Sequence, residues 1–409
     1  MNFKIAIIII MVLGHIYQAV LNIVKYRSAN NPTPKNVSDV YDAETYAKWK
    51  KYSAEHCTVS LVFTLVYCVV YLVLLLTNAF SMLSGIFPQT FGMQILSVLL
   101  VELAVDVVLG TVQKYIENMV IEQKYGFNRT KMKTFIADRI RSILLNFAFG
   151  YFIAFLIGDF YEKTGAWMIV LFATAMLVVI LVATFLAPVF MRIGNKFTPL
   201  EDGELKDRLM EMLTKHGYRV KAIKVMDASR RTTKLNAYFT GFGKLKSIVL
   251  FDNLVEAMTP DEICAVFAHE LGHGLHKDVL KGQILSFFSM TITGVIAWLA
   301  VSSEAFYTAF GFDGINYGFA YILVGFALSL VQPLIALVTN ARSRAAEYAA
   351  DRQAVDEGYG AALIGALKRL GKDNFAHLSP SKINVVLEYS HPPLSQRIEA
   401  IEKKITGEK

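Results

Sequence analysis

The sequence has few charged residues, few cysteines and no tract of low complexity. Only 18% of its 409 residues are charged and 54% are hydrophobic, whereas a typical soluble domain carries roughly 25% charge. This balance excludes intrinsic disorder, which requires low hydrophobicity and high charge. Three cysteines, an odd number set beside or within apolar stretches, exclude a disulfide-based scaffold. A wholly soluble protein is therefore not expected.

The sequence contains several long apolar stretches. A transmembrane helix needs about 20 mostly apolar residues, and seven stretches qualify. The first could also be a signal peptide, but no small-residue cleavage signal follows it. We therefore predict seven retained spans in the lipid bilayer, at about residues 3–24, 58–80, 92–113, 142–158, 167–190, 283–304 and 317–339.

Loops rich and poor in lysine and arginine alternate along the chain, as the positive-inside rule requires. Loop 25–57 holds six such residues and loop 114–141 holds seven, whereas loop 159–166 holds one and loops 81–91 and 305–316 hold none. These loops explain the net charge of +7 better than nucleic-acid binding does, so no nucleic-acid partner is predicted. The segments predicted to be cytoplasmic are 25–57, 114–141, 191–282 and 340–409.

Glu102 and Asp106 interrupt the third span and share one helical face, because they are four residues apart. Ionisable side chains within a span are costly and usually face a bundle interior or a wet cavity. We therefore predict a polar, water-filled interior. The alternative is a helix end that the chosen boundaries place too deep.

Segment 191–282 is predicted to form a small mixed domain of helices and strands. Helical spacing of Leu and Met comes first, and alternation of apolar and polar residues follows it. The expected elements are a helix at 205–215, strands at 218–227, 235–240 and 247–251, a hairpin turn at 241–244 and a helix at 261–276.

The helix expected over 261–276 carries a metal-binding pattern. It starts with a capping box formed by Thr259 and Glu262. It contains His269-Glu270-Leu271-Gly272-His273, which is the H-E-x-x-H pattern. Histidines four residues apart lie on one helical face and can bind one Zn²⁺ together, while the glutamate lies near a water on that metal. A chance match has a probability on the order of 1%, so we predict a zinc site.

A second polar helix is expected from about Arg342 to Glu357, directly after the seventh span. It offers Glu347 and Asp351, again four residues apart, with Arg344 one turn earlier. A catalytic zinc site needs a third protein ligand. One carboxylate would bind the metal, and the other would accept the free N–H of a histidine. Beside an H-E-x-x-H helix, this outweighs the interpretation as an ordinary charged face.

The stretch Tyr389–Arg397 contains a further candidate. His391 stands before two prolines, which hold its backbone extended, and Arg397 follows six residues later. Such a pair could stabilise an oxyanion. A surface histidine beside a turn would give the same pattern.

In order and combination, these motifs resemble the CAAX prenyl protease 1 family, membrane zinc metalloproteases also called a-factor-converting enzymes. The similarity runs from about residue 115 to about residue 400 and, through the pattern of spans, to the N-terminus. Besides the three motifs above, the similar stretches are Lys124–Thr130, Ala187–Phe190, Lys196–Leu200, Asn236–Gly241 and Ile248–Asp252.

The resemblance implies a fold and a division of the chain. The fold would be an all-α polytopic membrane protein, with about seven transmembrane helices around a large wet chamber and a small zincin-like α+β zinc protease domain in the cytoplasm. The predicted regions are 1–190 with helices 1–5, 191–282 with the metalloprotease domain, 283–339 with helices 6–7, and 340–409, which completes the zinc site.

The resemblance also implies a role for each site residue. One Zn²⁺ per chain would act on a peptide or protein substrate, prenylated or not. The metal ligands would be His269, His273 and Glu347. The catalytic residues would be the general base Glu270, Asp351 beside the ligands, and His391 and Arg397 at the scissile carbonyl or oxyanion. Substrate would be held by Asn236, Ala237, Tyr238 and Arg344 and by edge pairing with strand 246–251.

Some positions depart from the family pattern. Gly274 and Asp278 stand where relatives tend to have Trp and His, and His276 is interpreted as a solvent-facing or hydrogen-bonding histidine. The C-terminal residues lack a dilysine retrieval signal, which favours a bacterial cell membrane over the endoplasmic reticulum membrane.

Two other functions stay open at this stage. One is a broad quality-control membrane protease similar to the HtpX group, against which the seven spans and Lys196–Leu200 argue. The other is a transporter or scaffold with a relic zinc site, against which the intact ligand set and Glu270 argue.

Overall fold

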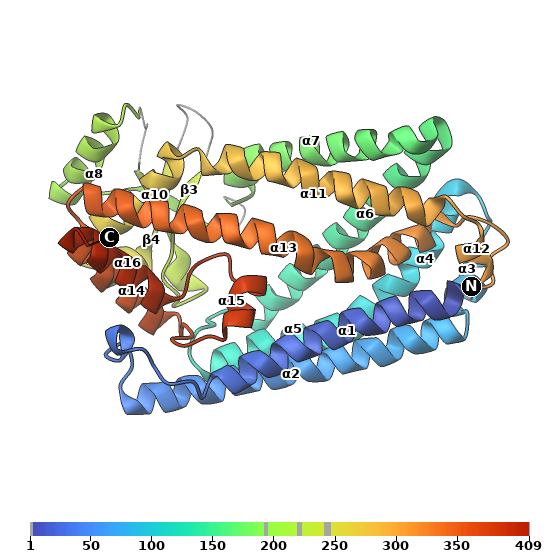
Figure 1. The fold of residues 1–409 in the computed structure, drawn as a ribbon, viewed down its shortest axis with the longest axis horizontal. Coiled ribbons are helices and arrows are strands. Elements are labelled where there is room, and N and C mark those ends of the chain that lie inside the picture. Colours follow the sequence, from blue (N-terminus) through green and yellow to red (C-terminus); the bar gives the residue numbers. More distant parts are fainter. Residues whose placement is uncertain (1–2, 192–194, 219–222, 241–246, 409) are drawn as a thin grey trace.

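Long helices dominate the structure, a computed structural model that describes residues 3–191, 195–218, 223–240 and 247–408. They run along the long axis of the molecule, and a small sheet with several short helices gathers at one end (Figure 1). The N-terminus lies at the opposite end (Figure 1). The chain thus has the predicted architecture of a helical membrane part joined to a compact α+β part.

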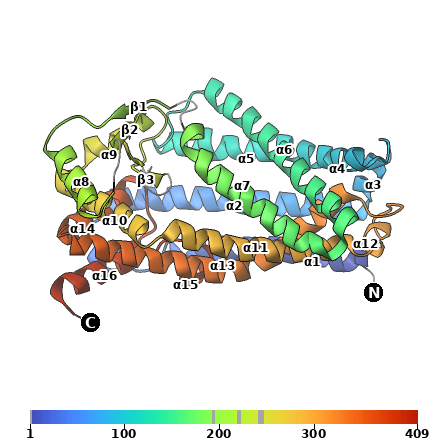
Figure 2. The same ribbon diagram turned by 90° about the horizontal axis from the view of Figure 1, so that it is seen from above.

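Six helical runs within the described residues are long and apolar enough to cross a membrane. One of them, Met132–Leu186, contains two helices between which the chain reverses at Gly165, whose φ is +56° (Figure 2). Counted separately, these two helices give the seven predicted spans. The helices are α1 (Phe3–Ser28), α2 (Ala43–Leu76), α4 (Phe91–Val105) continuing through two π-helical segments and α5 (Thr111–Tyr115) to Glu122, α6 (Met132–Thr164), α7 (Met168–Met191), α11 (Asp278–Val301) and α13 (Tyr317–Asp356).

Most side chains on these helices face outward. Between 11% and 33% of the apolar window of each run is buried within the protein. On α2, for example, Leu65, Val69 and Val73 are more than half exposed. Water would disfavour so large an apolar surface, and a lipid bilayer is the environment that suits it.

The two acidic residues of the third membrane helix have partners on neighbouring helices. The Tyr71 hydroxyl donates to Glu102 Oε2 at 2.8 Å, and Arg139 Nη2 lies 2.7 Å from Asp106 Oδ1. The helix continues to Glu122, so neither acid sits at a helix end. The helix therefore does not end at these positions, and the water-filled interior stays a prediction.

A four-stranded sheet forms the centre of the α+β part. Its order is β1-β2-β4-β3, with β2 and β4 parallel and the outer pairs antiparallel. The predicted strand at 247–251 is confirmed with the same bounds, and those at 218–227 and 235–240 are confirmed with narrower bounds. The further strand β1 is too short to show an alternating pattern. The predicted turn at 241–244 lies outside the described residues. The strands are β1 (Phe197–Pro199), β2 (Ile223–Met226), β3 (Ala237–Thr240) and β4 (Ser247–Phe251).

Short helices cover the sheet and enclose a second hydrophobic core. This core is separate from the one between the membrane helices and includes Leu213, Leu250, Phe267 and Leu271. The helices around it are α8 (Glu204–Lys215), α9 (Asp252–Ala257), α10 (Pro260–Leu275), α14 (Gly360–Asp373) and α16 (Leu394–Thr406). The short helix α15 (Lys382–Glu388) instead packs against α1 and α13. Two further short helices, α3 (Ala79–Ser84) and α12 (Ala305–Thr308), lie at the opposite end (Figure 1).

The predicted capping box of α10 is confirmed. Thr259 Oγ1 accepts from the Glu262 backbone N–H at 3.3 Å, and Glu262 Oε2 accepts from the Thr259 N–H at 2.9 Å. Two of the N–H groups that a helix start leaves unpaired are therefore satisfied. This fixes where α10 begins and, with it, the rotation of its histidine face.

The second polar helix is not a separate element. It is the end of α13, a helix of 40 residues that leaves the membrane part and runs along α10 (Figure 1). Gly272 of α10 lies against it, because a Cβ added there would meet Ala350 Cα at 2.9 Å. The glycine of the H-E-x-x-H pattern therefore allows the two helices to approach closely.

We predict that Gly272→Ala destabilises the protein by about 1–3 kcal/mol, the usual cost of overpacking, because the backbone of α13 would have to move. Thermal unfolding in detergent and bound metal by mass spectrometry would measure the effect. Gly282→Ala is the matched control, since its added Cβ would meet only Arg342 Nη1 at 3.7 Å. Equal melting temperatures for the two variants would contradict the prediction.

Candidate active site

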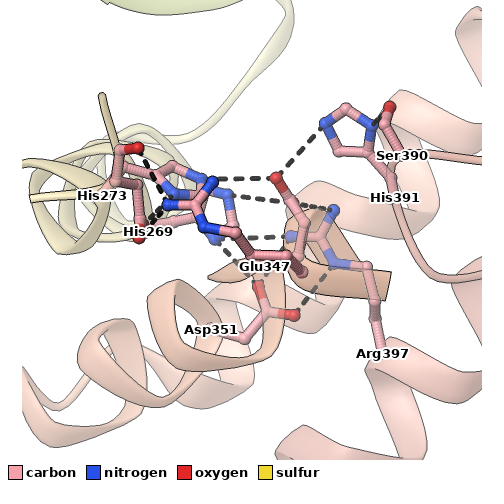
Figure 3. Close-up of polar contacts among 9 residues, drawn as sticks. His269, His273, Glu347, Asp351, Ser390, His391 and Arg397 are labelled. Carbon is pink, nitrogen blue, oxygen red and sulfur yellow. Dashed lines mark hydrogen bonds and ion pairs between the residues drawn. The ribbon is translucent and has the colours of Figure 1, made fainter. Parts of the chain in front are cut away.

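Two histidines of α10 and one glutamate of α13 converge (Figure 3). His273 Nε2 lies 3.3 Å from Glu347 Oε1, and His269 Nε2 lies 3.5 Å from Glu347 Oε2. One donor atom from each of the three residues lies within 4.8 Å of the others. This is the ligand set that the sequence predicted, brought to one point by the contact between α10 and α13.

Carboxylates hold both imidazoles in place. His269 Nδ1 lies 2.9 Å from Asp351 Oδ1, and His273 Nδ1 lies 3.0 Å from Asp278 Oδ2. When Nδ1 donates to a carboxylate, Nε2 is left as the basic atom of the ring. Both Nε2 atoms therefore face Glu347 as metal ligands would. Asp351 has the position predicted for it.

Sequence reasoning missed the role of Asp278, which it recorded only as a departure from the family pattern. The chain turns at Lys277, whose φ is +55°, and this brings Asp278 at the start of α11 back to His273. Arg342 of α13 then donates to the backbone carbonyl of Asp278 at 3.0 Å. A lone carboxylate five residues beyond a histidine gives no pattern from which this could be predicted.

The residues present fit a divalent transition metal ion. Two imidazole nitrogens and one carboxylate form the donor set of many catalytic zinc sites. Glu347 is 5% exposed, and its buried Oε2 accepts no hydrogen bond of normal geometry from a described residue. Arg397 Nη1 and His269 Nε2 lie 3.4 and 3.5 Å from this oxygen. A buried acceptor without a donor is costly, and coordination to a cation would satisfy it.

The cluster also perturbs the acidity of its members. Burial alone would raise the pKa of Glu347, but hydrogen bonds with His269 and His273 hold it well below the usual range. Burial alone would lower the pKa of His273, but its bonds to Glu347 and Asp278 raise it to about 9. Burial raises the pKa of Glu270, and the neighbouring histidines oppose the rise only in part.

A cavity of about 590 Å³ opens onto this cluster. Glu270, His391 and Arg397 line it together with the three candidate ligands. His391 Nε2 lies 3.3 Å from Glu347 Oε1, and the His391 side chain is 65% exposed. The general base and the C-terminal motif predicted from the sequence thus meet at the candidate metal site.

Arg397 of α16 binds the carboxylates beneath the cluster (Figure 3). Its Nε and Nη2 donate to Asp351 at 2.9 and 2.6 Å, and its Nη1 lies 3.4 Å from Glu347 Oε2. Such a two-pronged contact uses the planar fork of the guanidinium. In this structure, Arg397 balances the charge of the buried acids.

The predicted substrate-binding residues lie in two different places. Asn236 and Ala237 line the cavity, and the backbone of Tyr238 follows in the edge strand β3. Strand 246–251 was expected to pair with substrate, which is wrong, because β4 already has β2 and β3 on its two edges. Arg344 is not among the residues that line this cavity.

His276 is not part of the candidate metal group. Its Nδ1 is buried and makes no hydrogen bond with any described residue.

Comparison with known proteins agrees with this geometry. Residues 199–405 match the model of peptidase family M48, and residues 22–192 match the CAAX prenyl protease N-terminal model with five membrane helices. The chain belongs to peptidase family M48. The predicted family resemblance is confirmed, and this M48 member is a membrane-embedded metalloprotease.

Individual relatives match over most of their length. The CAAX prenyl protease 1 of Saccharomyces cerevisiae is 32% identical, over 90% of this chain and 88% of that protein. A CAAX prenyl protease 1 homolog of Oryza sativa subsp. japonica is 29% identical, over 97% and 96%. The crystal structure of S. mikatae Ste24p matches with a TM-score of 0.89 at 27% identity and covers 98% of this chain and 99% of that chain.

We predict that protein stripped of metal binds zinc more tightly as the pH rises from 7 to 9. With a pKa of about 9, His273 is protonated at pH 7, and zinc must displace that proton. The affinity should rise by up to about tenfold per pH unit for each proton displaced. Competition with a chelator of known affinity at pH 7, 8 and 9 measures this. Asp278→Asn should make the dependence shallower, and an affinity independent of pH would contradict the prediction.

Proposed function

We propose that this M48 peptidase is a zinc endopeptidase that cleaves near the C-terminus of its substrates. The proposed substrates are prenylated CAAX peptides. The observation that carries the proposal is the convergence of two histidines, Glu347 and Glu270 in one cavity. The CAAX class is supported by the match of residues 22–192 and by the printed names of the relatives. Both favour this class over broad quality-control proteolysis.

The chemistry assigns one task to each residue around the cavity. A zinc ion on His269, His273 and Glu347 would polarise the scissile carbonyl and acidify water. Glu270, with its raised pKa, takes the proton from the attacking water and delivers it to the leaving amine. His391 donates a hydrogen bond to the developing oxyanion. An oxyanion contact from Arg397 stays a prediction.

Substrate binding is proposed at the edge strand β3. Within the described part of the chain, β3 pairs with β4 on one side and with no strand on the other, so this other edge can pair with an extended peptide. Asn236, exposed at the start of this strand, and Ala237 line the cavity. A peptide added to β3 would therefore pass beside Glu270.

The protease end of the molecule is proposed to face the cytoplasm. The lysine- and arginine-rich segment 25–57, which comprises the end of α1, the connection and the start of α2, lies at that end, and the N-terminus lies at the other (Figure 1). Positive loops stay on the cytoplasmic side of a membrane. The four predicted regions, with protease segments 191–282 and 340–409 separated by two spans, are proposed on the same basis. A bacterial cell membrane stays a prediction, and the relatives named above come from eukaryotes.

We predict that Glu270→Gln keeps its metal and loses nearly all turnover, because an amide cannot take the proton from water. Glu347→Ala should lose the metal as well. Turnover and metal content of both purified variants, beside the wild type, measure the two effects. Cleavage by Glu270→Gln at the wild-type rate would contradict the assignment of Glu270 as the general base.

The substrate class is tested with a farnesylated CAAX peptide and its unprenylated twin, each with and without 1,10-phenanthroline. We predict chelator-sensitive cleavage that requires the prenyl group. Equal, chelator-sensitive cleavage of both peptides would favour a quality-control protease instead. Cleavage that resists the chelator would contradict the metal mechanism.

A further inference from the structure

The side chain of Arg344 binds the end of a helix. Its Nη1 donates to the carbonyls of Val385 and Tyr389, both at 2.8 Å. Asn340 lies one turn earlier on α13, and its Nδ2 donates to the Leu387 carbonyl at 2.9 Å. Two side chains of α13 thus hold three alternate carbonyls, those of residues 385, 387 and 389, at the C-terminal end of α15.

These contacts provide hydrogen-bond donors for carbonyls at the end of α15. The last carbonyls of any helix lack partners within the helix, and α15 has only seven residues. A cation at a helix C-terminus is also favoured by the helix dipole. The planar guanidinium can hold two carbonyls at a set spacing, which an ammonium does less well. We call Arg344 and Asn340 the α15 clamp.

A second contact holds α15 from its other side. Asn384, 1% exposed, donates to the backbone carbonyl of Leu21 in α1 at 3.0 Å and to Glu388 Oε2 at 2.6 Å. Figure 1 shows α15 beside α13. The short helix is therefore fixed between the first and last membrane helices, although its own length gives it little stability.

The clamp ends two residues before His391. Beyond His391 stand Pro392 and Pro393, both buried, which restrict the backbone before α16 begins. Among the described residues, the His391 ring makes polar contacts with Ser390 Oγ at 2.9 Å and with Glu347 at 3.3 Å, and no others are found. The place of an exposed ring with so few contacts is determined by the backbone that carries it.

Arg344 also shares α13 with Glu347, three residues further on. A clamp on this helix therefore sets the backbone before His391 relative to the helix that supplies the third metal ligand. A histidine that stabilises an oxyanion must lie within hydrogen-bond distance of the position that this oxygen occupies. A displacement of about 1 Å can lower the rate by about a hundredfold.

We propose that Arg344 and Asn340 are positioning residues, which place His391 at the reaction site by clamping α15 to α13. The inference rests on the proposed role of His391. It gives Arg344 a positioning role in place of the substrate-binding role expected from the sequence. Neither residue of the clamp is among the residues that line the active-site cavity.

A double-mutant cycle tests the inference. Arg344→Gln is made in the wild-type chain and in His391→Ala, and kcat, KM and bound metal are measured with the peptide that the enzyme cleaves. We expect Arg344→Gln to lower kcat by about ten- to a hundredfold, with KM and metal content unchanged. In the His391→Ala background, Arg344→Gln should not lower kcat any further. Arg344→Lys should recover part of the lost rate.

Arg352→Gln is the matched control, because Arg352 is exposed on the same helix and has no polar side-chain partner among the described residues. It should keep the wild-type kcat. If Arg344→Gln also lowers the melting temperature or the metal content, Asn340→Ala, which removes one hydrogen bond, takes its place in the cycle.

The outcomes separate the inference from the proposed function. An equal loss in both backgrounds would overturn the clamp, since Arg344 would then act independently of His391. If His391→Ala lowers kcat and Arg344→Gln does not, the positioning role of the clamp would be overturned, whereas the role of His391 would be supported. An unimpaired His391→Ala would overturn that role and the clamp with it. Loss confined to the wild-type background supports the inference.

Discussion

The close contact between α10 and α13 brings together side chains that are far apart in the sequence. Gly272 leaves room for Ala350, so the imidazoles of α10 reach Glu347 on α13 at 3.3 and 3.5 Å. Because α13 is a single helix that continues from the membrane part, the third candidate ligand is attached rigidly to the membrane domain. Any change that separates these two helices would open the metal site, and any tilt of α13 would move it.

The site also requires that the negative charges of its buried carboxylates are compensated. Glu347 and Asp351 are buried, and isolated buried carboxylates are strongly destabilising. His269 of α10 and Arg397 of α16 supply the opposite charge from different elements. A cation held by the candidate ligands would add to it. A buried polar network is favourable only when every member has its partner. The cluster therefore favours the one arrangement in which α10, α13 and α16 are all docked.

Much of this was predictable from local pattern. Apolar stretches predicted the membrane helices, and the spacing of His269, His273, Glu347 and Asp351 predicted which side chains share a helical face. Boundaries were less accurate, because the second polar helix proved to be the end of α13 and two of the three predicted strands proved shorter. The role of Asp278, the interior position of β4 and the contacts of Arg344 were missed. Each depends on a partner that is distant in the chain or on a turn without a sequence signature.

The sequence by itself determined that the protein crosses a membrane, that it carries an H-E-x-x-H helix and that a carboxylate pair accompanies it. Hydropathy and helical period are properties of neighbouring residues, so they can be read without a fold. Only the tertiary structure decided which carboxylate faces which imidazole, which strand is left at the edge of the sheet and what holds the segment of His391. These depend on distances between residues such as Arg344 and Tyr389, 45 positions apart, and packing alone sets such distances.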